Sequence, residues 1–148
     1  MKDQKKMYIG SFLLGFGFLG ALDGIVFHQL LQWHSVIHEA PTTIQIISDG
    51  LFHFAVTLTI IAGAVLLWLS GKPQEPKSAW KSAGGLFLIG GGTFNLLEGI
   101  INHHILQIHR VHPEAENPLL FDLAFLASGV ILLGAGWLLL RTVKQLDV

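Results

Sequence analysis

Four long apolar runs decide what this chain can fold into. They cover residues 8–31, 51–69, 83–101 and 119–140, and each approaches or exceeds the roughly 20 residues that a helix needs to cross the hydrocarbon core of a bilayer. With 51% hydrophobic and 13% charged residues, the composition differs from that of an ordinary soluble domain. We therefore predict an all-α integral membrane protein, in which residues 1–148 form a single transmembrane four-helix bundle surrounded by lipid.

The basic residues predict which way the helices cross the membrane. All but one lie before the first run, between the second and third runs, or after the fourth run, and Arg110 is the exception. These residues are Lys2, Lys5, Lys6, Lys72, Lys77, Lys81, Arg141 and Lys144. By the positive-inside rule both termini are cytoplasmic, and the loops 38–48 and 110–118 lie on the outer side. We expect the protein in the bacterial cytoplasmic (inner) membrane.

A polar phrase occurs twice in the apolar sequence. "LDGIVFHQLLQWH" at residues 22–34 returns as "LEGIINHHILQIH" at residues 97–109, 75 positions later. The spacing pairs Asp23 with Glu98, Gly24 with Gly99, His28 with His103, Gln32 with Gln107 and His34 with His109. We infer an internal repeat of a helical hairpin, covering residues 8–70 and 83–141, in which the first and third helices face each other.

Ionisable side chains recur at similar heights in the four predicted helices. Counting about 1.5 Å per residue from the cytoplasmic ends places all of them roughly 24 to 32 Å up, in the outer half of the bilayer. They are Asp23, His28, Asp49, His53, Glu98, His103 and Asp122. Isolated charges in lipid cost several kcal/mol, so such residues face the protein interior, pair with one another or bind ions.

The residue types in this layer favour a metal site. Imidazole and carboxylate donors suit zinc, iron, manganese or copper(II), whereas copper(I) is disfavoured because the chain has no cysteine and its methionines lie at the cytoplasmic end. The predicted ligands are His28, His53, His103, Asp23, Asp49, Glu98 and Asp122, with His34, His104 and His109 as weaker candidates. This predicts a metal-binding protein or, with an open coordination position, a membrane metalloenzyme that activates water or oxygen.

An α-helical projection places some of these residues relative to one another. Asp49 and His53 are four apart and share a face. Asp23 and His28 are about 140° apart around the helix axis, which predicts that they lie on opposite flanks. The same projection turns His104 away from the centre, where a subunit contact is the competing explanation.

Three other interpretations of the layer stay open. Haem ligated by His28 and His103 is one, with glycines leaving room for the macrocycle, although haem does not explain the acidic residues and glycines also let membrane helices pack closely. A proton path is another, but the inner half of the membrane holds no ionisable residue, so only an outer half-path is available, through His34, His38, His109 and His112. The third is a salt-bridged network that fixes helix register.

The phrases "LDGIVFHQLLQWH", "SDGLFH", "FNLLEGIINHHILQIHRVH" and "DLAFLASG" resemble a family of small bacterial four-span membrane proteins classed as a domain of unknown function. The likeness covers residues 10–141. Some members of that family are joined to domains resembling the CtaG-type assembly factors of cytochrome oxidase. The resemblance implies a link to copper or haem delivery at the outer face, with respiratory oxidase assembly components as partners. A homodimer is a further expectation, and a nucleic-acid partner is not.

Overall fold

The computed structural model describes residues 3–72 and 76–144, and helices are the regular elements of this part of the chain. The four long helices are α1 (Gln4–Asp23), α2 (Thr42–Leu69), α3 (Pro76–Glu98) and α4 (Pro118–Lys144), while the shorter π-helical segments η1 (Gly24–Leu30) and η2 (Gly99–Ile105) continue α1 and α3. Within the described residues, four helices are long and apolar enough to cross a membrane. The predicted all-α fold with four membrane-spanning helices is confirmed.

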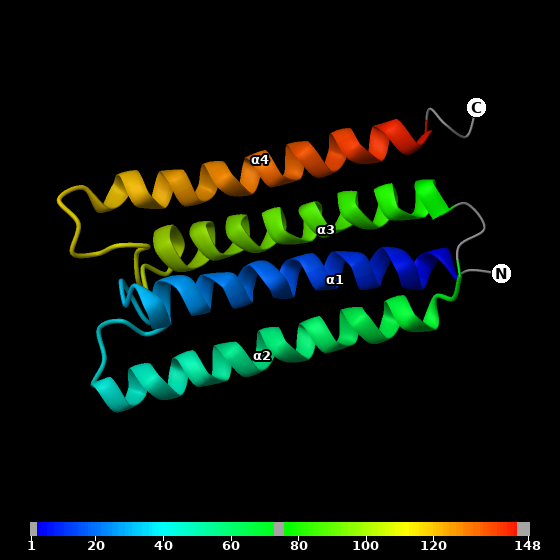
Figure 1. Ribbon diagram of the computed structural model, residues 1–148. Coiled ribbons are helices and arrows are strands. Elements are labelled where there is room, and N and C mark those ends of the chain that lie inside the picture. The colour runs from blue at the N-terminus through cyan, green and yellow to red at the C-terminus, as the bar shows by residue number, and fades with distance from the viewer. Residues whose placement is uncertain (1–2, 73–75, 145–148) are drawn as a thin grey trace.

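The helices lie side by side in the order α2, α1, α3, α4 (Figure 1). The inner pair, α1 and α3, pack on each other, whereas α2 contacts α1 and η1, and α4 contacts α3 and η2. Within the described residues α2 and α4 do not meet, so the bundle is open rather than a closed ring. The start of α1 and the end of α4 lie at one end of the row, and the loops 31–41 and 106–117 lie at the other end (Figure 1).

Local sequence explains where several helices begin. The Asp3 side chain accepts a hydrogen bond from the Lys6 N–H at 3.2 Å and caps the start of α1. Both α3 and α4 begin with a proline, whose missing N–H would have no partner at that position in any case. The outer helices α2 and α4 expose many large apolar side chains, as helices surrounded by lipid do.

Glycines allow the two central helices to approach each other closely. A Cβ atom at Gly15 would collide with the backbone carbonyl of Phe87, and one at Gly90 would collide with that of Phe12. Glycines also stand at the contacts of α1 with α2 and of α3 with α4. These are Gly10, Gly63, Gly85, Gly92, Gly129 and Gly136. Small residues at helix contacts are typical of membrane proteins, in which backbones must come close for van der Waals packing.

Each central helix changes its winding near the loop end. The segments η1 and η2 start at glycines 75 positions apart, Gly24 and Gly99, and are π-helical over seven residues each. Beyond them the backbone turns sharply at Gln32 and Gln107, whose φ angles of 53° and 51° are left-handed. Single turns of π-helix are rare and occur frequently at functional sites.

The glycine contact between α1 and α3 makes a stability prediction. We expect Gly90→Ala to destabilise the folded protein by about 1–3 kcal/mol, because the added methyl group meets backbone that cannot move aside. Gly134→Ala in α4 is the matched control, since a Cβ there has no neighbour within 4 Å. Thermal unfolding in detergent should show a lower Tm for Gly90→Ala only. Equal Tm values for the two variants would contradict the close contact.

Candidate metal centre

The π-helical turns bring acid and imidazole side chains together. The His28 Nε2 atom lies 3.4 Å from Asp23 Oδ2, and His103 Nε2 lies 3.8 Å from Glu98 Oε1. The α-helical projection was therefore wrong to place Asp23 and His28 on opposite flanks. A π-helix closes its hydrogen bonds from residue i to i+5, so residues five apart in sequence come onto one face.

At Gln32 and Gln107, where the backbone is left-handed, the chain turns back toward these acid–imidazole pairs. His34 follows Gln32 and His109 follows Gln107, and both imidazoles are buried. Their rings stack on each other with centroids 4.5 Å apart and planes 10° apart. The centroid of His34 lies 4.6 Å from that of His28, and the centroid of His109 lies 4.9 Å from that of His103. Four imidazoles thus form a continuous group in the order His28, His34, His109, His103.

Backbone carbonyls hold one nitrogen of each stacked ring. His34 Nδ1 is 2.8 Å from the carbonyl oxygen of Val111, and His109 Nδ1 is 2.9 Å from that of Val36. A neutral ring that donates its Nδ1–H to a carbonyl has its free lone pair on Nε2. Histidines that bind metals have this arrangement, because the second hydrogen bond fixes the tautomer and the orientation of the ring.

Carboxylates lie beside the Nδ1 atoms of the other two imidazoles, although these nitrogens make no hydrogen bond. Asp49 Oδ1 lies 3.2 Å from His28 Nδ1, and Asp122 Oδ1 lies 3.7 Å from His103 Nδ1. Each carboxylate is also held by a loop N–H, from Val36 to Asp49 at 2.8 Å and from Val111 to Asp122 at 3.0 Å. Asp49 and Asp122 therefore suit an orienting role, with His28 and His103 presenting Nε2 toward Asp23 and Glu98.

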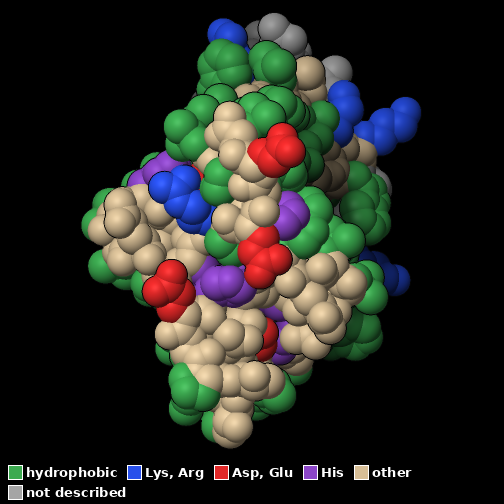
Figure 2. Space-filling view, turned by 90° about the vertical axis from the view of Figure 1, so that its left-hand side faces the viewer, with side chains coloured by type: hydrophobic (Ala, Val, Ile, Leu, Met, Phe, Trp, Pro, Cys, Tyr) green, Lys and Arg blue, Asp and Glu red, His purple; other side chains and the backbone are tan. Residues whose placement is uncertain are grey.

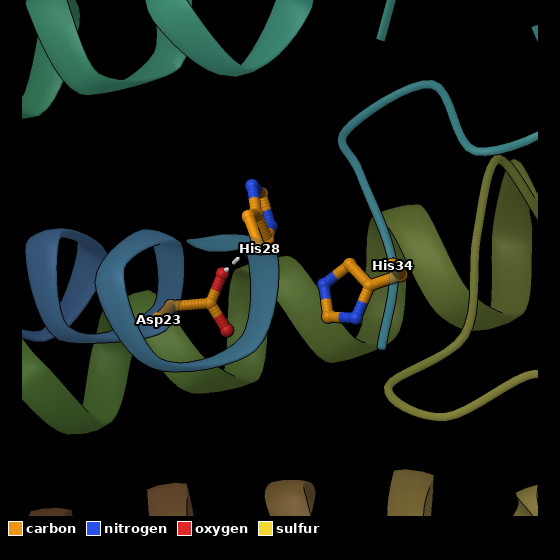
Figure 3. A group of neighbouring side chains, drawn as sticks. All are labelled: Asp23, His28 and His34. Atoms are coloured by element: carbon orange, nitrogen blue, oxygen red, sulfur yellow. Dashed lines mark ion pairs between the residues drawn. The ribbon is translucent and has the colours of Figure 1, made fainter. Parts of the chain in front are cut away.

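Two sets of three donors result. Asp23, His28 and His34 form the first set, and Glu98, His103 and His109 form the second set, with the donor atoms of each set within 4.8 Å of one another. Figure 3 shows the first set, in which the His34 ring from the loop points toward Asp23 and His28 from the helix. The Nε2 atoms of all four histidines are buried; His109 Nε2 lies 2.9 Å from Glu98 Oε1, whereas those of His28, His34 and His103 have no hydrogen-bond partner. Two imidazoles and one carboxylate on one side of an ion are a common metal-binding arrangement that leaves coordination positions open.

The two loop histidines differ in their electrostatics. Burial and the neighbouring His109 lower the pKa of His34 to about 2, so its Nε2 lone pair is free at physiological pH. Burial also acts to lower the pKa of His109, but the contact with the Glu98 carboxylate, 2.9 Å from Nε2, outweighs it and raises that pKa. A proton and a metal ion therefore compete for the pair of His109 and Glu98.

The remaining predicted ligands lie outside both sets. His53 is half-buried against the start of η1, where a Cβ at Gly24 would meet its ring, and its Nε2 has no partner. His104 is half-buried and belongs to neither set. His34 and His109 were ranked below His53 in the sequence analysis, yet they supply one donor to each set. The repeat was the signal that pointed to them, because it preserves both.

The two predicted axial ligands of a haem, His28 and His103, lie at the two ends of the group of four imidazoles. The stacked rings of His34 and His109 stand between His28 and His103, the two predicted axial ligands. Neighbouring side chains fill the space beside the glycines. Val56 and Phe94 lie against Gly20, and Leu126 lies against Gly99.

The fold and the site together define a membrane protein with four membrane-spanning helices and a buried cluster of histidines and carboxylates at one end. The chain belongs to the family described as predicted membrane protein DUF2243, whose model matches residues 10–143. Comparison with curated proteins and with solved structures gives no match.

The orienting carboxylates make a prediction about stability. Asp122 is fully buried and holds Val111 N–H and the Arg110 guanidinium, each at 3.0 Å. We expect Asp122→Ala to lower the free energy of unfolding by about 2–3 kcal/mol, because it leaves the Val111 N–H without an acceptor and Arg110 without its ion-pair partner. Glu114→Ala removes an exposed acid from the same loop and should change stability by less than about 0.5 kcal/mol. Chemical unfolding in detergent compares the two, and equal stabilities would contradict the role given to Asp122.

Proposed function

We propose that this protein binds transition metal ions through the cluster of His28, His34, His103, His109, Asp23 and Glu98, in the outer-leaflet half of a bacterial inner membrane. The observation that carries the proposal is the set of four buried imidazoles, three of which, those of His28, His34 and His103, have Nε2 atoms without a hydrogen-bond partner. A buried polar atom without a partner is costly, and bound cations would supply the missing partners.

The charge of the cluster supports the same conclusion. Four carboxylates, those of Asp23, Asp49, Glu98 and Asp122, are buried or nearly so, while among the described residues Arg110 is the one Lys or Arg paired with them. With neutral histidines the described cluster carries four negative charges and one positive charge. An uncompensated charge of that size at the end of membrane helices needs bound cations or protons.

The donor set supports a borderline or hard divalent metal. Three donors with two imidazoles and one carboxylate match zinc sites of the catalytic kind and non-haem iron(II) sites. We favour zinc, iron, manganese or copper(II) and do not propose haem, because the space between His28 and His103 holds two other imidazoles.

The position of the cluster supports exchange of metal at the loop end. Figure 2 views this end and shows histidine and acidic side chains reaching the surface there. The loops carry the half-buried His38 and His112 and the exposed Glu39 and Glu114. If both termini are cytoplasmic, this surface faces outward, where the protein would handle metal, including metal for respiratory oxidase assembly.

Metal content tests the proposal. We expect protein purified in detergent, supplied with Zn²⁺ or Fe²⁺ and then desalted, to retain at least one metal ion per chain by elemental analysis. The double variant His34→Ala/His109→Ala should retain less than a tenth of that amount, because each donor set loses an Nε2 atom.

His104→Ala and His38→Ala are matched controls, because both histidines are half-buried and neither belongs to a donor set. Both should retain metal as the wild type does. Metal-free wild type, or equal content in wild type and the double variant, would refute the proposal. Circular dichroism of each variant shows whether the helices are intact.

A membrane metalloenzyme is the second candidate function. The specific observation is that each set holds three protein donors, which leaves room for water or a substrate in the coordination sphere. Small anions occupy such positions. We expect azide to change the visible absorption spectrum of the Co²⁺-loaded protein. An unchanged spectrum at saturating azide would show that the coordination sphere is closed and would count against catalysis.

A further inference from the structure

We propose that each chain binds two metal ions in neighbouring positions, one in each donor set, and that the first set binds more tightly than the second. This inference rests on the proposed function and extends it to the number and order of the ions. The first position is formed by Asp23, His28 and His34, and the second position by Glu98, His103 and His109.

The donors of the two positions come from separate parts of the chain. Asp23 and His28 belong to α1 and η1, and His34 follows them, whereas Glu98 and His103 belong to α3 and η2, and His109 follows them. Each set of mutually close donors therefore lies within one half of the chain. A single ion in the first set would leave His103 Nε2 buried without a partner, and a single ion in the second set would leave the Nε2 atoms of His28 and His34 in that state.

The loop imidazoles of the two sets, those of His34 and His109, are in contact. His34 and His109 stack with centroids 4.5 Å apart, and each is anchored on a carbonyl from the opposite loop, at Val111 and Val36. Ions bound to the Nε2 atoms of stacked rings repel each other in a medium of low dielectric constant. The second ion should therefore bind in the presence of the first ion more weakly than it would alone.

The halves differ in charge. In the first half Asp23 and Asp49 carry two negative charges, which one divalent ion neutralises. In the second half Arg110, whose equivalent 75 positions earlier is Ser35, pairs with Asp122 at 3.0 Å. Glu98, Asp122 and Arg110 then sum to one negative charge, so a divalent ion leaves an excess positive charge. The charge of Arg110 therefore favours filling of the first position before the second.

Titration with Cu²⁺ in detergent tests number, order and proximity. We expect two equivalents to bind in two steps, with dissociation constants that differ by about tenfold or more. The EPR spectrum should be that of an isolated Cu²⁺ ion up to one equivalent. It should broaden or lose intensity per ion as the second equivalent binds, because two paramagnetic ions at close range interact.

Variants assign the steps. His34→Ala should remove the tighter step and His109→Ala the weaker step, so that each variant binds one equivalent and shows no broadening. Arg110→Gln should strengthen the weaker step about tenfold, because it removes the positive charge beside Asp122. Arg110→Lys keeps that charge and should leave both steps as in the wild type. His104→Ala should also leave both steps unchanged.

The outcomes separate this inference from the proposed function. One equivalent of Cu²⁺ in the wild type, or two equivalents without magnetic interaction, would overturn the paired site and leave metal binding intact. Loss of the tighter step in His109→Ala rather than in His34→Ala would overturn the order. Failure of the wild type to bind any metal would refute the proposed function itself.

Discussion

The structure depends on one constraint, which is that charged and polar groups placed at the end of membrane helices must find their partners within the protein. The cost of leaving a carboxylate or imidazole unpaired in lipid is several kcal/mol. Asp23, Asp49, Glu98 and Asp122 each lie beside an imidazole nitrogen. The central position of α1 and α3 follows, because these helices carry most of the polar groups and the outer helices cover them.

Changes in backbone winding make the pairing possible. The segments η1 and η2 bring residues five apart onto one face, and the left-handed Gln32 and Gln107 then direct His34 and His109 inward. A left-handed conformation at a residue with a side chain costs free energy of order 1–3 kcal/mol, and it persists where the surroundings compensate for it. Here the bonds from His34 and His109 to the opposite loop provide that compensation.

Sequence predicted the fold better than the site. The length of the apolar runs was enough to predict four helices, and the spacing of 75 residues indicated which polar residues correspond. It did not reveal that Asp23 and His28 share a face, because hydropathy cannot distinguish a π-helical turn from an α-helical one. It ranked His53 above His34, because depth along a helix was the criterion and His34 lies in a loop beyond the helix. The sequence could not predict that the carbonyls of Val36 and Val111 bind the loop histidines, because a pattern of side chains does not indicate which backbone acceptors lie nearby.

The exchange of hydrogen bonds between the loops has a consequence for assembly. The Val36 N–H donates to Asp49 in its own half of the chain, and the Val36 carbonyl accepts from His109 in the other half. Likewise, the Val111 N–H donates to Asp122, and the Val111 carbonyl accepts from His34. Each loop histidine needs a backbone carbonyl from the other half of the chain, so neither half can form all the hydrogen bonds of its loop end alone. The two ends therefore close together in one cooperative event, and a hairpin inserted by itself would keep its loop histidine untethered until its counterpart arrived.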